Sequence, residues 1–195
     1  KNENQLLPLP AGAKILVTGP GAHDIGQQTG GWTLSWQGTG NSREHFPQGE
    51  SIFEGLAAAL EAGGGQAVLS EDGNWSEAPD AAIVVYGEDP YAESVGDRGN
   101  VDYDPADGLE LLQRLKAAGI PTVSVFISGR PLWVNPELNG SDAFVAAWLP
   151  GSEGGGIADL LIAGADGSPR HDFSGRLSFS WPAAASQVEV NVGDA

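Results

Sequence analysis

The stretch that decides the fold is residues 81–97, with the sequence Ala-Ala-Ile-Val-Val-Tyr-Gly-Glu-Asp-Pro-Tyr-Ala-Glu-Ser-Val-Gly-Asp. Its first six residues are apolar without interruption, and Gly87 follows them. An unbroken apolar run is typical of a strand that is buried on both faces of a parallel sheet. Sites in open α/β sheets lie where such strands end, so the loop after Gly87 is the first place to look for chemistry.

That loop carries three acids, Glu88, Glu93 and Asp97, beside Tyr91. The composition suits acid/base chemistry on a sugar or polyol. Glu88 follows the strand closely and could be buried, with hydrogen bonds to loop amides. Asp97 is typical of a turn or cap residue, whereas Glu93 lies in mid-loop and could project toward a partner. The residues alone leave the three acids as nearly equal candidates.

Further apolar runs predict the rest of the sheet, at residues 14–18, 66–69, 122–127 and 143–149. Alternation with period two at 177–181 and 188–192 predicts edge or antiparallel strands with one solvent-facing side. Strands that alternate with helices predict an α/β three-layer sandwich. We expect a mostly parallel sheet with an antiparallel edge strand, flavodoxin-like in arrangement.

Three helices are predicted from apolar spacing and cap residues. The first runs from Ile52 to the glycines at 63–65, and the second from an Asp104 N-cap to Gly119. A short third helix is expected around 157–163, with Ser152 as its cap. Four glycine-rich loops should then meet at one edge of the sheet, namely 19–49, 87–104, 128–136 and 150–156.

Two tryptophans stand four residues apart in the first of these loops. We expect Trp32 to pin the loop to the body of the domain. Trp36 is favoured as a platform for a sugar ring, because the C–H face of a sugar packs on an aromatic face. The remaining tryptophans lie in or beside predicted elements and are expected to serve packing.

Composition excludes several classes of partner and site. The 195-residue chain has 9 Lys and Arg against 26 Asp and Glu, for a net charge of −17. Phosphate binding needs basic patches, so neither nucleic acid nor an anionic membrane is expected as a partner. The chain has no cysteine, and no run approaches the roughly 18–20 apolar residues of a membrane span. The first residues do not have the pattern of a signal peptide.

No cofactor or metal is predicted. Gly19-Pro20-Gly21 follows a predicted strand but lacks the third glycine of a dinucleotide loop, and Pro20 removes a backbone donor. The sequence Gly151-Ser152-Glu153-Gly154 is out of register for a hydrolase elbow. The three histidines lie far apart, with no metal-ligand spacing, and only His23 falls near the expected site.

Five motifs occur together along the chain: Lys-Asn-x-x-x-Leu-Leu-Pro-Leu at 1–9, Gly-Gly-Trp-x-x-x-Trp-Gln-Gly at 30–38, Gly-Glu-x-Pro-Tyr-x-Glu at 87–93, Ser-Gly-Arg-Pro at 128–131 and Ala-Trp-Leu-Pro-Gly-Ser-Glu-Gly at 147–154. In this combination the chain resembles the second, α/β-sandwich domain of glycoside hydrolase family 3. It is similar to the cereal β-glucan exohydrolases and the marine bacterial exo-β-glucanases of that family. The resemblance extends over essentially the whole chain.

The resemblance implies a retaining, exo-acting glycosidase whose aspartate nucleophile lies in a preceding TIM barrel. By motif match, Glu93 is the general acid/base and Trp36 clamps the sugar at the +1 position, while Trp32 is the motif's other indole. Residues 1–12 would be a linker from that barrel and residues 13–195 the sandwich domain. The implied substrates are β-glucans and cello- or laminari-oligosaccharides, and the implied location is extracytoplasmic.

Without the barrel, Glu93 is expected to be exposed with an ordinary pKa, on a mobile loop. This domain alone should then be inactive. The alternative is a non-catalytic carbohydrate-binding module that uses Trp36. A nucleotide-binding α/β domain is a third interpretation, disfavoured by the glycine pattern.

Overall fold

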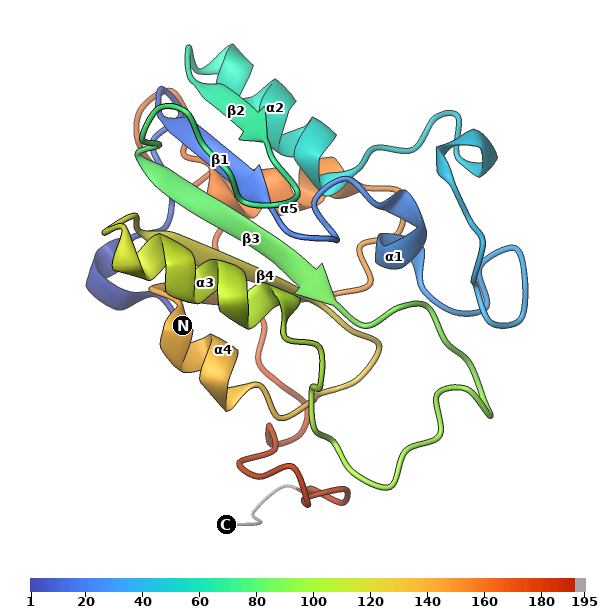
Figure 1. Ribbon diagram of the computed structural model, residues 1–195. Helices are drawn as coiled ribbons and strands as arrows, with labels where there is room; N and C mark the ends of the chain where they lie inside the picture. The colour runs from blue at the N-terminus through green and yellow to red at the C-terminus, as the bar shows by residue number, and fades with distance from the viewer. Residues whose placement is uncertain (192–195) are drawn as a thin grey trace.

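The computed structural model describes residues 1–191 and is built on a five-stranded sheet (Figure 1). The strands are β1 (Lys14–Thr18), β2 (Gln66–Leu69), β3 (Ala81–Gly87), β4 (Thr122–Ile127) and β5 (Ala143–Trp148). Their order is β2-β1-β3-β4-β5, and every neighbouring pair is parallel. This is the flavodoxin-like order, so the predicted α/β sandwich with a parallel sheet is confirmed.

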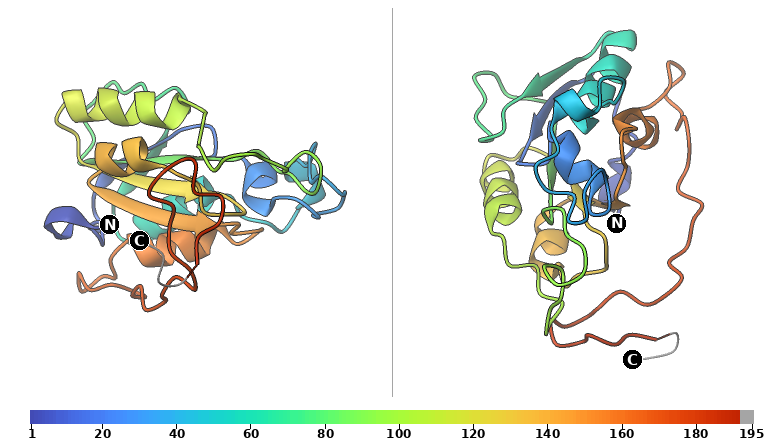
Figure 2. Two further views of the ribbon diagram at one scale, coloured as in Figure 1. Left: turned by 90° about the horizontal axis from the view of Figure 1, so that it is seen from below. Right: turned by 90° about the vertical axis from the view of Figure 1, so that its right-hand side faces the viewer.

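Helices cover both faces of the sheet and make a three-layer sandwich (Figure 2). Helices α2 (Ile52–Ala62) and α5 (Gly154–Leu161) pack on one face, while α3 (Asp107–Ala117) and α4 (Asn135–Gly140) pack on the other. A short helix, α1 (Ile25–Thr29), lies in the long loop after β1, and single 3-10 turns occur at Glu3–Gln5 and Arg43–His45. Neither α1 nor α4 was predicted, because both are too short to show a helical period.

Strand β3 is buried along its whole length, as its apolar run predicts. Ile83 and Val85 belong to the cluster under α2 and α5, whereas Val84 and Tyr86 belong to the cluster under α3 and α4. The register pairs Gly87 with Ile127, so β3 and β4 end level with each other. The loops that leave these two strands therefore start side by side.

The contact between α2 and α5 explains a run of glycines that reads as loop in the sequence. A Cβ on Gly55 would lie 2.6 Å from the Gly155 backbone, and one on Gly154 would lie 2.2 Å from the Ser51 backbone. Helix α5 accordingly begins at Gly154, earlier than predicted. The prediction that Ser152 caps this helix is wrong, because the Glu50 carboxylate accepts the Gly155 N–H instead, at 2.8 Å.

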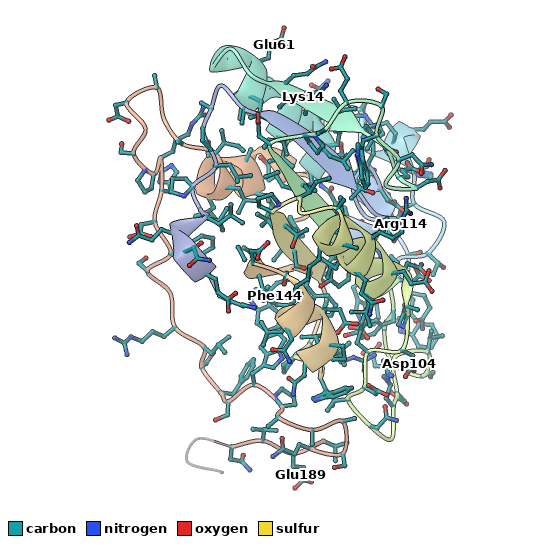
Figure 3. All side chains as sticks on the ribbon, turned by 60° about the vertical axis from the view of Figure 1, so that its left-hand side comes forward. Lys14, Glu61, Asp104, Arg114, Phe144 and Glu189 are labelled. Atoms are coloured by element: carbon teal, nitrogen blue, oxygen red, sulfur yellow. The ribbon has the colours of Figure 1, made fainter. Side chains whose placement is uncertain are left out.

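Helix α3 begins three residues after the predicted N-cap. Its N-cap is Ala106, which makes no side-chain cap. Asp104 is unavailable for capping because its carboxylate pairs with Arg98 at 3.1 Å, and Figure 3 shows Asp104 on the loop outside the helix that carries Arg114. Asp104 therefore belongs to the 87–104 loop, where it pairs with Arg98 of the same loop, and it is not part of the helix.

The predicted antiparallel edge strand is wrong for the described residues. Residues 177–181 and 188–191 form no strand, and Val192 lies outside the described part of the chain. The segment after α5 instead runs as an extended trace over the outside of the domain (Figure 2). Its alternating aromatics serve surface packing: the Trp181 ring contacts Trp148, and its indole N–H donates to the Leu132 carbonyl at 2.7 Å.

The first residues pack along the body of the domain. Leu9 is buried, its N–H donates to Leu161 O at 2.7 Å, and its carbonyl accepts the Ala163 N–H at 2.9 Å. In residues 1–191 no helix has the length and apolar character needed to cross a bilayer.

Candidate active site

The four predicted loops meet at the carboxyl edge of the sheet, as expected. Gln28 donates to Gly151 O at 2.7 Å and joins the first loop to the last. Gln27 donates to Gly87 O at 3.2 Å and joins the first loop to the end of β3. Ser128 Oγ donates to Glu88 at 2.7 Å and joins the β3 and β4 loops.

Glycines are required where the first loop touches the second through its backbone and where the first loop folds back on itself. A Cβ on Gly31 would lie 1.8 Å from Tyr91 O, which no side chain could tolerate. Gly38 has a φ of +71°, in the left-handed region, and a Cβ there would lie 2.1 Å from Gly30 O. The glycine-rich sequence thus seats the tryptophan loop directly on the Glu93 loop.

The structure brings the two predicted site residues together. The Trp36 indole N–H donates to Glu93 Oε2 at 2.8 Å. The next side chain, Gln37, donates to the Glu93 carbonyl at 2.9 Å and accepts the Ala92 N–H at 2.7 Å. Neighbouring residues of one loop therefore hold both the carboxylate and the backbone of Glu93.

Glu93 is exposed, as predicted, but its pKa is not ordinary. The indole N–H of Trp36 stabilises the carboxylate and holds the pKa of Glu93 below its usual value, with a further contribution from the loop backbone. The carboxylate is therefore the resting form of this side chain in the domain. Mobility of its loop stays a prediction.

Both tryptophans of the first loop are exposed, Trp32 by 68 % and Trp36 by 51 %. Their ring centroids are 6.5 Å apart and their planes are tilted by 47°. The prediction that Trp32 pins the loop is wrong, because the close glycine contacts and Gln37 hold the loop. The pair instead offers an aromatic surface beside Glu93, of the kind on which sugar rings pack.

The other two acids belong to the scaffold. Glu88 is nearly buried, and its carboxylate accepts N–H groups of Arg130 at 2.8 and 3.0 Å. Its partners are thus the side chains of Arg130, Ser128 and, at 3.8 Å, Arg98, rather than loop amides. Asp97 is a turn residue whose N–H donates to Ser94 O at 3.3 Å.

Tyr91 packs between these groups. The Arg130 guanidinium lies 4.2 Å from the centroid of the Tyr91 ring, a cation–π contact. Burial, with the nearby charge of Glu88, raises the pKa of Tyr91 to about 12, so the phenol stays protonated at neutral pH. A pocket of about 170 Å³ opens beside it, between Trp32 and Leu149.

The histidines take no part in this site. His23 lies 2.7 Å from Ser51 Oγ, near the start of α2, and packs edge-on against Phe53. Among residues 1–191 no three or more His, Asp or Glu side chains are grouped to hold a metal ion.

Neither Gln37 nor Arg130 was predicted from the sequence as a site residue, although both lie in the family motifs quoted above. Gln37 is the middle residue of Trp-Gln-Gly, and a single glutamine carries no sequence pattern that predicts its contact with another loop. Arg130 had a usable signal: with 9 basic against 26 acidic residues, an arginine at the site edge is expected to pair with a loop acid.

Comparison with known proteins gives one family over the chain. The model of the glycosyl hydrolase family 3 C-terminal domain matches residues 1–194. A lysosomal beta glucosidase of Dictyostelium discoideum is 35 % identical over 97 % of this chain and 25 % of its own length. A periplasmic beta-glucosidase of Salmonella typhimurium is 29 % identical over 97 % of this chain and 28 % of its own length.

Among solved structures, an exo-1,3/1,4-beta-glucanase from a Pseudoalteromonas species is 52 % identical, with a TM-score of 0.96. The match covers 100 % of this chain and 25 % of that one. A beta-glucosidase from Listeria innocua is 27 % identical, with a TM-score of 0.66, over 87 % of this chain and 24 % of its own. The chain therefore spans about a quarter of the length of these relatives.

Proposed function

Because this chain belongs to glycosyl hydrolase family 3, as the family's C-terminal domain, we propose that it supplies the general acid/base of a retaining, exo-acting β-glucosidase or exo-β-glucanase. Glu93 is the acid/base, and Trp36 is the platform for the sugar on the leaving-group side. The observation that carries the proposal is the pairing of an exposed indole with an exposed carboxylate, 2.8 Å apart, on touching loops.

The reaction needs a second carboxylate. A retaining glycosidase holds its two carboxyl groups about 5–5.5 Å apart, one as the nucleophile and the other as proton donor and then base. The nucleophile in this proposal is an aspartate of a TIM barrel that precedes residue 1. Residues 1–12 then serve as the link, and residues 13–195 form the domain that closes over the barrel mouth.

The proton balance follows from the environment of Glu93. A general acid must hold its proton at working pH, yet the pKa of Glu93 is lowered in the uncovered domain. Closing the carboxyl against a barrel removes water and brings a like charge near, and both effects raise a carboxyl pKa. The domain alone is therefore inactive for two reasons, a missing nucleophile and a deprotonated acid.

The substrates proposed are β-glucans and cello- or laminari-oligosaccharides, cleaved from their non-reducing ends. The activity for which the Pseudoalteromonas relative is named, exo-1,3/1,4-beta-glucanase, supports a β-glucan. An extracytoplasmic location is proposed with it, supported by the periplasmic and lysosomal names of two relatives.

The test is Glu93→Gln in the full-length enzyme, with Asp97→Asn as the control in the same loop. For a substrate with a poor leaving group, Glu93→Gln should lower kcat/KM by about 10²–10⁴-fold, the usual contribution of general acid catalysis. For an activated aryl glucoside, formation of the glycosyl-enzyme should be nearly spared, because that leaving group needs no proton. Full activity of Glu93→Gln on the poor leaving group would refute the assignment.

The exposure of both tryptophans favours one alternative, a non-catalytic carbohydrate-binding module. In that case Trp36→Ala would weaken oligosaccharide binding to this chain in calorimetry, while Glu93→Gln would leave turnover of the full-length enzyme unchanged. Binding of a nucleotide in the same experiment would instead support a nucleotide domain.

A further inference from the structure

The amide of Gln37 makes two hydrogen bonds to the backbone on either side of the Ala92–Glu93 peptide. Its Nε2 donates to the Glu93 carbonyl at 2.9 Å, and its Oε1 accepts the Ala92 N–H at 2.7 Å. A side-chain amide that both donates and accepts in this way holds a segment much as a neighbouring strand does. The orientation of Glu93 is thus fixed from a different loop.

We propose that Gln37 is a positioning residue for Glu93: it holds the acid/base peptide so that the carboxyl meets the Trp36 indole and the leaving oxygen. The inference rests on the proposed role of Glu93 as acid/base. Trp36 and Gln37 are adjacent, so one dipeptide fixes the carboxylate through its indole and the main chain through its amide.

No other described segment offers an equivalent hold on this part of the loop. Residues 92–95 are otherwise joined by bonds inside their own loop, from Gly96 N to Ala92 O and from Asp97 N to Ser94 O. Ser94 has a φ of +76°, which is unfavourable for a residue with a side chain. Such a turn needs outside contacts to persist, and the tryptophan–glutamine stretch provides them.

Precise placement matters for this chemistry. An acid/base must come within about 2.6–3.2 Å of the oxygen that it protonates. A displacement of about 1 Å from the productive geometry can lower a rate by about 10²-fold. Loss of the Gln37 amide should therefore act on the proton-transfer step and leave the fold in place, because Gln37 lies at the rim of the domain.

The experiment compares Gln37→Leu with Asn41→Leu in the full-length enzyme. Asn41 is the matched control, since its amide also makes two hydrogen bonds in this loop, but both go to its own loop, at Thr33 O and Gly38 O. We expect Gln37→Leu to lower kcat/KM on a poor leaving group at least tenfold more than on an activated aryl glucoside. Asn41→Leu should affect both substrates equally.

A double variant separates positioning from a merely structural role. In a Glu93→Ala background, Gln37→Leu should cause no further loss on the poor leaving group, because the residue it positions is gone. A further tenfold loss in that background, or equal losses of Gln37→Leu on both substrates, would overturn the inference while leaving the role of Glu93 intact. Undiminished activity of Glu93→Ala would instead overturn the proposed function, and the inference with it.

Discussion

Replacing Arg130 with methionine should destabilise the domain far more than the loss of an exposed ion pair on the surface of the domain. The Arg130 guanidinium donates twice to Glu88, donates once to the Gly96 carbonyl and covers the Tyr91 ring. It thereby joins the end of β3, the far part of the Glu93 loop and the aromatic between them. Methionine keeps much of the side-chain volume and removes the charge and all the donors.

The expected magnitude follows from the burial of the pair. The Glu88 side chain is 9 % exposed and that of Arg130 is 25 % exposed. Removing one partner of a buried ion pair costs about 3–5 kcal/mol, because the other charge stays buried. The quarter exposure of Arg130 and the nearby Arg98, 3.8 Å from Glu88, favour the lower end. We expect a loss of about 3 kcal/mol in the free energy of unfolding, or about 6–12 °C in melting temperature at about 2–4 °C per kcal/mol.

Urea unfolding of this chain measures the loss, with Arg43→Met as the matched control. Arg43 pairs with Glu54 at 2.9 Å, but its side chain is 50 % exposed, so its removal should cost about 0–1 kcal/mol. Adding Glu88→Gln to Arg130→Met should restore stability, since no unpaired charge then remains buried. The reasoning fails if Arg130→Met and Arg43→Met differ by less than about 1 kcal/mol, or if the double variant is less stable than Arg130→Met.

Two further outcomes concern titration. Burial raises the pKa of Glu137, whose Oε2 has no hydrogen-bond partner in the described chain. As pH rises, Glu137 therefore ionises in the unfolded chain before it ionises in the folded one. The free energy of unfolding falls between the unfolded and the folded pKa of this carboxyl. Glu137→Gln should remove this pH dependence. In urea unfolding from pH 4 to 8, the free energy of unfolding of the variant should therefore gain on that of the unchanged chain as pH rises. Parallel plots of the two free energies against pH would contradict the raised pKa of Glu137. Trp36→Phe removes the indole donor that lowers the pKa of Glu93, so the titration midpoint of this carboxyl, followed by carbon NMR in this chain, should move up; an unchanged midpoint would show that the indole is not the cause.

The sheet was predictable because burial leaves a direct mark on sequence. Residues 81–87 lie between two helical layers, so every position is apolar or small, and the run marks both the strand and its end. The alternation with period two at 177–181 also predicted a strand, but it has a different cause. Its aromatics, Phe179 and Trp181, both pack on the Trp148 ring, where no neighbouring backbone completes a ladder. Periodicity reports which side chains are covered, and it does not report what covers them.

The site was predictable only in part, because it is a contact between loops. The sequence and its family motifs indicated Trp36 and Glu93, which do meet. The register between their loops depends on Gly31 fitting under the Tyr91 carbonyl, and no local pattern encodes that fit. Gln37 was missed for the same reason, since both hydrogen bonds of its amide are made to another loop, at Ala92 and Glu93.

The hydrogen bond between Trp36 and Glu93 also has a consequence for how the proposed acid works. The indole N–H favours the carboxylate, which is the form needed when Glu93 acts as base in the second step of a retaining reaction. It opposes the protonated form that the first step needs. In the proposed enzyme, closure against the barrel must therefore raise the pKa of Glu93 above the working pH, and drawing the indole away onto the sugar would assist this rise. Under the proposed function, closure then protonates Glu93 as the substrate becomes enclosed, and the open domain stays inactive.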